Sequence, residues 1–548
     1  MKWRSAFLWL SAFGVALLLT LAFLRAEQVR QPIFGRYPAP GDNTWRINLT
    51  AALDLTRYWH QEGFLQSGMI PRFHAPSVSN PYSGSNYLSY PPLFILAPLA
   101  FAYATGKPPD LEALTKVSIF SHCAMAVLAA LFVFIAAQGC GTDAIPALWL
   151  GGISGSLSLL VPASLIYFPF GWWADMAGLP FFAAMVALEA WAPRWGGSKN
   201  FRLFQACLAF MGVFADWLFV LLLGALFLKD LTAQVRKIRW EFLAAPFVYG
   251  CYHVYLVASS GTWKDFSQKV LLRSGISHQN TPFTSGLASW QEILLKGLGE
   301  NGYYLYLLTL AALPILLFAF FLRRRLSEKL RTWVELCFLM VVPMFLHSFL
   351  LRQHYYHHTY NAVKFALQIS VVWFGLLPAL ASFLNKRLAP QYLAVALSFY
   401  GAVAYAKSFH PVYANFFASP LNLNSTLERY CQILYRNSAR SAIHFSADFA
   451  THMLSGSPAP APELPISTWG VAACGNPVYL SRSPADFPLY YLENRWNLRL
   501  VGVNFQLLLW SLGPPAKIWQ NYIIAGSRQK IGELEVHELS KNILTHGI

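Results

Sequence analysis

Residues 36–93 decide how this chain is organised. They contain three polar, proline-containing stretches: Arg36-Tyr-Pro-Ala-Pro-Gly-Asp42-Asn43, Ser67-Gly68-Met-Ile-Pro71-Arg72-Phe73 and Tyr87-Leu-Ser-Tyr90-Pro91-Pro92-Leu93. A long apolar run precedes the first stretch, and an amphipathic run joins the first to the second. Amphipathic segments of this kind lie at a membrane surface. A carboxylate placed directly after a hydrophobic helix, with such a segment behind it, predicts a functional site at the membrane boundary.

The composition is that of a membrane protein. Of the 548 residues, 56% are hydrophobic and only 12% are charged, against about 25% charged in an ordinary soluble chain. Ten or eleven apolar stretches of roughly 20 residues precede residue 407, whereas residues 408–548 are polar with short strand-like runs such as 533–539. We predict a polytopic α-helical membrane domain at 1–407, with about 11 transmembrane helices, and a C-terminal extracytoplasmic α/β domain at 408–548.

The formal net charge is +16. In a membrane protein, such a charge most commonly comes from basic inner loops and from sites for anionic head groups. No basic stripe suited to a nucleic-acid groove is visible, so nucleic acid is not an expected partner. The seven cysteines show no metal-binding spacing. Cys431 and Cys474 are the two in the tail, and they could pair if the tail is extracytoplasmic.

Basic residues also predict the topology. Lys2 and Arg4 place the N-terminus inside. A membrane-spanning helix at 6–24 then leads to a loop at 25–114 on the outer side. The apolar run after Pro92 reaches only about 21 Å against roughly 30 Å of hydrocarbon, and is expected to be re-entrant or surface-lying. Residues 203–228 are expected to form two short helices that turn at Asp216, because one helix would put the next basic cluster outside. The other predicted helices are 115–138, 144–168, 176–192, 240–259, 303–322, 332–351, 362–384 and 389–406.

This topology gathers acidic and basic residues at the outer face. Asp42, Asp175 and Asp216 lie there, together with a loop rich in tyrosine and histidine that runs from Arg352 to Lys364. Carboxylates at such a site can act as a general base, bind a metal or accept from sugar hydroxyls. Arginine and lysine suit a phosphate group. The set predicts a transfer reaction on a lipid-phosphate substrate.

Each of these residues also has a purely structural interpretation. Asp42 can be a turn or helix-capping residue, because it follows Pro-Gly. Asp175 can cap the helix at 176–192, and Asp216 can serve only the turn between two helices. His354, His357 and His358 can belong to an interfacial aromatic belt with the neighbouring tyrosines. Sequence reasoning alone leaves these alternatives open.

The order of these parts resembles the GT-C class of membrane glycosyltransferases, which includes protein O-mannosyltransferases and the aminoarabinose transferases of lipid A. The resemblance rests on Gly41-Asp42-Asn43 after the first helix, Ser67–Phe73, Tyr90–Leu93, Ala174-Asp175-Met176 and Tyr360–Phe365. The chain departs from the class at Asn43, where many relatives have a second carboxylate. It departs again at Tyr90, where the usual residue is lysine.

The resemblance implies transfer of a sugar from a polyprenyl-phosphate donor to an extracytoplasmic acceptor (protein, lipid or glycan), with inversion of the anomeric carbon. It implies Asp42 and Asp175 as catalytic residues and as ligands of any Mg or Mn ion, although some relatives require no metal. The predicted location is the inner membrane, with the site and the tail on the periplasmic side. The predicted substrate-binding residues are Arg72, Tyr90, Asp216, Arg352, His354, His357, His358 and Lys364.

Two other functions fit a chain of this kind. A transporter or flippase for lipid-linked saccharides would be expected to have inverted repeats and binding groups near the middle of the membrane, but no internal repeat is visible. A polysaccharide polymerase or ligase would be expected to have its large loop late in the chain, whereas here the early loop is the elaborate one.

Overall fold

The structure is a computed structural model of the whole chain. It describes residues 2–34, 47–72, 87, 91–170, 172–195, 198–232, 238–260, 263, 266–267, 303–351, 361–384, 388–408, 443–445, 489–494, 522–531 and 534–541. The chain forms two compact units. The first comprises Met1–Gln31, Leu88–Thr262 and Gly286–Val412, and the second comprises Pro32–Tyr87, Trp263–Ser285 and Tyr413–Ile548.

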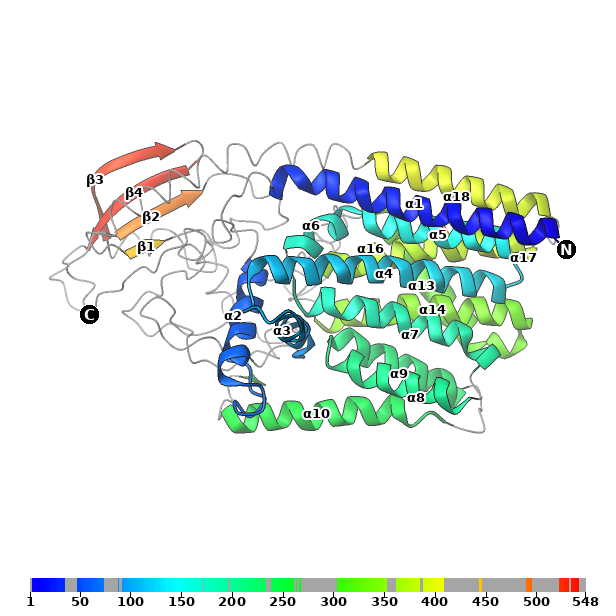
Figure 1. Cartoon of the computed structure of the whole chain (residues 1–548), viewed down its shortest axis with the longest axis horizontal. Coiled ribbons are helices and arrows are strands. Elements are labelled where there is room, and N and C mark those ends of the chain that lie inside the picture. Colours follow the sequence, from blue (N-terminus) through cyan, green and yellow to red (C-terminus); the bar gives the residue numbers. More distant parts are fainter. Residues whose placement is uncertain are drawn as a thin grey trace. The chain divides into compact units, whose positions relative to one another are not determined.

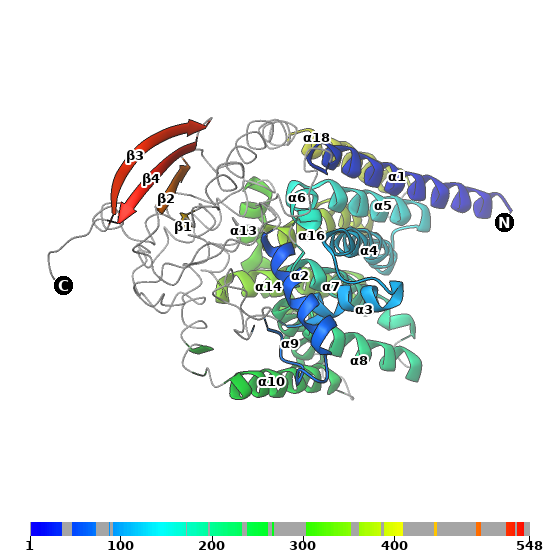
Figure 2. The same ribbon diagram turned by 60° about the vertical axis from the view of Figure 1, so that its left-hand side comes forward.

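The first unit is a bundle of helices that run alongside one another (Figure 1). Helices α1 and α18 lie together at one edge, and α10 lies at the opposite edge beyond α8 and α9, in both Figure 1 and Figure 2. The helices of this unit are α1 (Lys2–Phe34, which continues beyond it), α3 (Leu93–Thr105), α4 (Leu111–Gly139), α5 (Ala144–Leu160), α6 (Pro162–Phe170), α7 (Ala174–Trp195), α8 (Lys199–Val213), α9 (Trp217–Thr232), α10 (Glu241–Ser260), α13 (Tyr303–Phe321), η2 (Arg323–Arg325), α14 (Glu328–Leu350), α16 (Ala362–Val371), η4 (Val372–Leu376), α17 (Leu377–Leu384) and α18 (Leu388–Ser408).

Among the described residues, six helical segments are long and apolar enough to cross a membrane: Ser5–Arg30, Glu112–Gly139, Ala174–Ala192, Glu241–Ser259, Glu328–Leu350 and Ala362–Leu380. The last segment runs through α16, η4 and into α17. The first is 11% buried within the protein, against 72% for the span that begins at Ala174. Phe7, Trp9 and Phe13 are exposed on α1, as expected of side chains that face lipid tails. The chain is therefore a polytopic α-helical membrane protein, as its composition predicted.

Two predictions about helix length and division are confirmed, while the membrane position of the helix after Pro92 and the side on which Asp216 lies stay predictions. The helix after Pro92 is short (α3, Leu93–Thr105), and the apolar run 203–228 forms two helices, α8 and α9, with Asp216 in the turn between them. The prediction of one helix at 144–168 is wrong. Val161 has an extended backbone (φ −65°, ψ 136°), because the ring of Pro162 disfavours a helical conformation in the residue before it. The helix therefore breaks into α5 and α6.

The second unit includes α2 (Ile47–Glu62) and a four-stranded sheet. The turn after α2 is held by the indole of Trp59, which donates to the carbonyl of Ile70 at 3.2 Å. The strands are β1 (Ile443–Phe445), β2 (Leu489–Asn494), β3 (Tyr522–Ile531) and β4 (Leu534–Lys541) in the order β1-β2-β4-β3. Strand β1 is parallel to β2, and the other two pairs are antiparallel. The predicted strand at 533–539 corresponds to β4, while Cys431 and Cys474 lie outside the described residues.

Candidate functional site

Four ionisable side chains meet inside the first unit. Asp175 comes from the first turn of α7, Asp216 from the α8–α9 turn, His347 from the last turns of α14 and Lys364 from the first turn of α16. The Nζ atom of Lys364 lies 2.5 Å from Oδ1 of Asp175 and 2.9 Å from Oδ2 of Asp216. Residues separated by up to 189 positions (175 to 364) thus form one cluster, which we call the Asp175–Lys364 cluster and define by these four residues.

The cluster is closed to solvent in this structure. The side chains of Asp175 and Lys364 are 0% exposed, Asp216 is 2% exposed and His347 is 1% exposed. Buried ions require partners, because removing an unpaired charge from water costs several kcal/mol. The two carboxylates and the ammonium group provide these partners for one another. Such burial also means that any substrate contact with these side chains requires groups to move.

Local sequence explains how Asp216 reaches the cluster. Its Oδ1 accepts a hydrogen bond from the backbone N–H of Leu218 at 3.1 Å, which is the bond of a residue that caps the start of a helix. Gly178 lies one turn after Asp175 on α7, and a Cβ atom added there would be 2.6 Å from Cβ of Asp216. Only glycine therefore lets the α8–α9 turn pack this closely against α7.

The protonation of His347 follows from its neighbours. Its Nε2 lies 3.3 Å from Nζ of Lys364 and 3.7 Å from Oδ1 of Asp216. An ammonium group only donates hydrogen bonds, so the ring nitrogen that pairs with it, Nε2 at 3.3 Å or Nδ1 at 3.5 Å, accepts and carries no proton. With a neutral histidine, the two carboxylates and one ammonium leave the Asp175–Lys364 cluster with a net charge of −1.

The four carboxylate oxygens of the cluster are not equivalent. Oδ1 of Asp216 accepts a hydrogen bond from Leu218, whereas Oδ2 of Asp216 and Oδ1 of Asp175 each form an ion pair with Lys364. Oδ2 of Asp175 is buried and has no hydrogen-bond partner among the residues that the structure describes. A buried polar atom without a partner is uncommon and marks a place where a ligand, a water molecule or a proton is expected.

A second buried contact lies at the same level of the bundle. Ser121 on α4 donates to the carbonyl of Met176, next to Asp175, at 2.9 Å. The adjacent residue, His122, lies 2.6 Å from Nη2 of Arg30 on α1. Arg30 is fully buried and also donates to the carbonyl of Leu165 on α6 at 3.1 Å. One turn of α4 thus connects the end of α1 to the start of α7.

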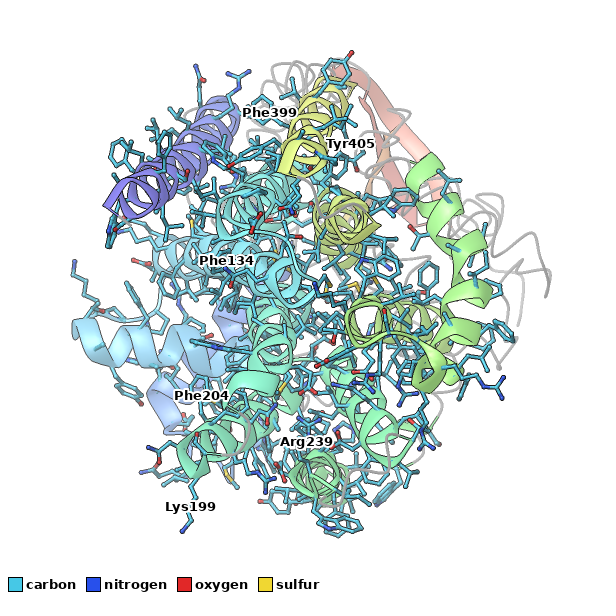
Figure 3. The ribbon with its side chains drawn as sticks, turned by 90° about the vertical axis from the view of Figure 1, so that its right-hand side faces the viewer. Phe134, Lys199, Phe204, Arg239, Phe399 and Tyr405 are labelled. Carbon is cyan, nitrogen blue, oxygen red and sulfur yellow. The ribbon has the colours of Figure 1, made fainter. Side chains whose placement is uncertain are left out.

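A separate ionic network lies elsewhere in the bundle, around Glu189 near the end of α7. Glu189 accepts from Lys229 at 2.6 Å and from Arg239 at 2.7 Å, and Arg239 also pairs with Asp230. Burial disfavours the charged guanidinium, but these carboxylates outweigh it and raise the pKa of Arg239 above its ordinary value. Glu335 adds ion pairs to Lys229 and Arg323, so three acids balance three bases. Figure 3 looks along the helices from this side, with Lys199 at the outer edge.

The structure therefore brings together three of the predicted site residues, Asp175, Asp216 and Lys364. Arg72 is described in the second unit, where it is half-buried. The sequence analysis missed His347, although an ionisable residue inside a predicted span is a functional candidate by default. The remaining predicted residues lie outside the described part of the chain: Asp42, Tyr90, Arg352, His354, His357 and His358.

Metal binding at this site has no geometric signature in the described ranges. There, no three histidine, cysteine or acidic side chains are arranged to hold a metal ion. Oδ1 of Asp175 lies 2.5 Å from Nζ of Lys364, so this oxygen is already paired with a cation. A metal shared by Asp42 and Asp175 stays a prediction, because Asp42 is not described.

Comparisons with known proteins give a structural likeness alone. No protein-family profile and no curated protein sequence matches the chain. Among solved structures, ArnT from Cupriavidus metallidurans bound to undecaprenyl phosphate matches with a TM-score of 0.41 and 12% identity, over 94% of this chain and 81% of that one. ArnT in the apo state matches with a TM-score of 0.37 and 13% identity, over 88% and 79%. ArnT is an aminoarabinose transferase with the GT-C fold. At these values the likeness assigns no activity to this chain.

Proposed function

We propose that the chain is an integral-membrane glycosyltransferase that moves a sugar from a polyprenyl-phosphate donor to an extracytoplasmic acceptor, with inversion. The observation that carries the proposal is the Asp175–Lys364 cluster. It joins three residues to which the sequence analysis gave catalytic or substrate-binding roles. It also leaves one carboxylate oxygen, Oδ2 of Asp175, free to accept a hydrogen bond from a substrate. The site faces the periplasmic side of the inner membrane in this proposal.

In the proposed reaction, Oδ2 of Asp175 accepts a hydrogen bond from the acceptor hydroxyl or amine. As the acceptor oxygen or nitrogen attacks the anomeric carbon, the bond from that carbon to the phosphate oxygen breaks, and the acceptor proton passes to a carboxylate. The lipid phosphate leaves as an anion, so no acid is needed to protonate it. Asp42 remains the other predicted catalytic carboxylate, and Arg352, His357 and Lys364 remain predicted substrate-binding residues.

The test is transfer of a labelled sugar by the purified chain from a panel of polyprenyl-phosphate-linked sugars. Removing a general base lowers the rate by roughly 100- to 10,000-fold, so Asp175→Asn is expected to lower kcat by that amount. Asp230→Asn is the matched control, because Asp230 is also buried and ion-paired but belongs to the Glu189 network. It is expected to leave kcat per folded molecule unchanged.

Two results would contradict the proposal. If wild-type protein transfers no sugar from any donor in the panel but moves a lipid-linked saccharide across vesicle membranes, the chain is a transporter. If Asp175→Asn retains full kcat while Asp42→Asn abolishes transfer, the chain is a transferase but the cluster does not act on the acceptor.

A further inference from the structure

We propose that Asp216 and His347 are positioning residues that fix the Lys364 ammonium group against Asp175, so that Oδ1 of Asp175 is held and Oδ2 faces the acceptor. This inference rests on the proposed function. It assigns a role to His347, which the sequence analysis did not select. It also replaces a direct substrate contact by Asp216 with an action through Lys364.

The first argument is the number of hydrogen-bond donors. An ammonium group has three N–H donors, and three acceptor atoms surround Nζ of Lys364. These are Oδ1 of Asp175 at 2.5 Å, Oδ2 of Asp216 at 2.9 Å and Nε2 of His347 at 3.3 Å. The ammonium group is therefore surrounded by acceptor atoms of the protein. A phosphate oxygen of the lipid donor would have to displace one of them.

The second argument is the flexibility of lysine. Its charge sits at the end of a four-carbon chain with several rotatable bonds, so one contact with Asp175 would not fix its direction. Asp216 and His347 add two contacts, and they come from two different elements, the α8–α9 turn and α14. The three contacts together fix Nζ in space. A lysine held in this way keeps Asp175 in one orientation.

The third argument separates Asp216 from Asp175. Both oxygens of Asp216 are used, one by the backbone of Leu218 and the other by Lys364, and Gly178 fixes the distance of the turn from α7. Both oxygens of Asp216 thus contact groups of the protein. Oδ2 of Asp175 has no hydrogen-bond partner among the described residues, which divides the two carboxylates into a reacting and a supporting residue.

The experiment compares His347→Leu with His347→Gln, whose amide oxygen can still accept from Lys364. His347→Leu is expected to lower kcat by roughly 10- to 100-fold, as for a displacement of about 1 Å at a reacting group, with KM changed less than twofold. His347→Gln is expected to recover kcat to within about threefold of wild type. Ser348→Ala is the control, because Ser348 is the next residue on α14 and is buried, with a local bond to Phe345.

The outcomes separate positioning from other roles. A rise in KM at constant kcat would overturn the inference in favour of direct substrate binding. Equal kcat per folded molecule in His347→Leu, His347→Gln and Ser348→Ala would overturn it in favour of a structural role alone. Asp216→Asn is expected to behave like His347→Leu, so that kcat falls and KM stays nearly unchanged.

A readout without activity distinguishes failure of this inference from failure of the proposed function. If His347 acts through Lys364, then in the Lys364→Met background His347→Leu is expected to cause no further shift in the temperature of unfolding in detergent. Additive shifts would overturn the positioning role, whether or not the chain transfers a sugar. Absence of transfer by wild type, with non-additive shifts, would reject the proposed function and leave the arrangement around Lys364 in place.

Discussion

Replacing Lys364 with methionine tests whether the buried ion cluster exists. The substitution keeps an unbranched side chain of similar length but removes the ammonium group between Asp175 and Asp216. With an effective dielectric constant of about 20, the attraction at 2.5 Å and 2.9 Å is about 7 and 6 kcal/mol. Desolvation of the ions opposes most of this attraction.

The net effect of the substitution follows from what remains. Lys364→Met leaves two carboxylates buried together with no cation, and breaking a buried pair by removing one partner costs about 3–5 kcal/mol. We expect a loss of that size in the free energy of unfolding, measured by reversible SDS titration in mixed micelles. The double substitution Lys364→Met with Asp175→Asn is expected to regain part of the loss, because only one buried carboxylate then remains.

The control is an exposed ion pair in the same protein. Lys116 lies 2.7 Å from Glu112 on α4, but the two side chains are 61% and 73% exposed. Surface pairs of this kind contribute little because water screens them, so Lys116→Met should leave the stability unchanged within error. If Lys364→Met were no more harmful than Lys116→Met, the buried cluster would not exist as described. The argument for Asp175 would then fail with it.

Two further predictions concern packing and the second ionic network. Gly178→Ala is expected to destabilise the protein by about 1–3 kcal/mol, because the new methyl group meets Asp216. Gly224→Ala is the control, because a Cβ atom at Gly224 meets nothing within 4 Å. It should be neutral or stabilising in the same SDS titration. Arg239→Gln removes a cation that pairs with Glu189 and is expected to cost roughly 3 kcal/mol. An unchanged stability in either Gly178→Ala or Arg239→Gln would contradict the corresponding contact.

Much of the helical arrangement could be predicted from charge and length. The division of 203–228 into α8 and α9 followed from keeping the basic residues after Lys229 on the inner side. The short helix after Pro92 followed from the length of its apolar run. Both predictions used physical constraints that act over the whole chain, namely the orientation of basic loops and the thickness of the bilayer. These constraints hold whatever the details of packing.

The break at Val161 and the role of His347 could not be predicted in the same way. Pro162 was visible in the sequence, but proline is tolerated inside membrane helices where neighbouring groups satisfy the freed backbone, as at Pro314 in α13. His347 lies 17 positions before Lys364, on a different helix. Only the packing of α14 against α16 places their side chains together, and no periodicity in the sequence encodes that contact.

The charge of the cluster bears on where the lipid phosphate binds in the proposed reaction. Lys364 is a cation, and the sequence analysis gave it a substrate-binding role, which suits an anion. Lys364 lies between the carboxylates of Asp175 and Asp216, so the cluster as a whole has a net charge of −1. A phosphate anion brought to Nζ would be repelled by both carboxylates. To reach the phosphate, Lys364 would also have to leave one of its present hydrogen-bond acceptors unpaired in a buried site. The phosphate is therefore expected to bind at other cations, of which Arg352 is the first to test. Lys364 instead orients Asp175, which contacts the acceptor substrate. Arg352→Gln should then raise KM for the lipid donor, whereas Lys364→Met should lower kcat in the molecules that remain folded.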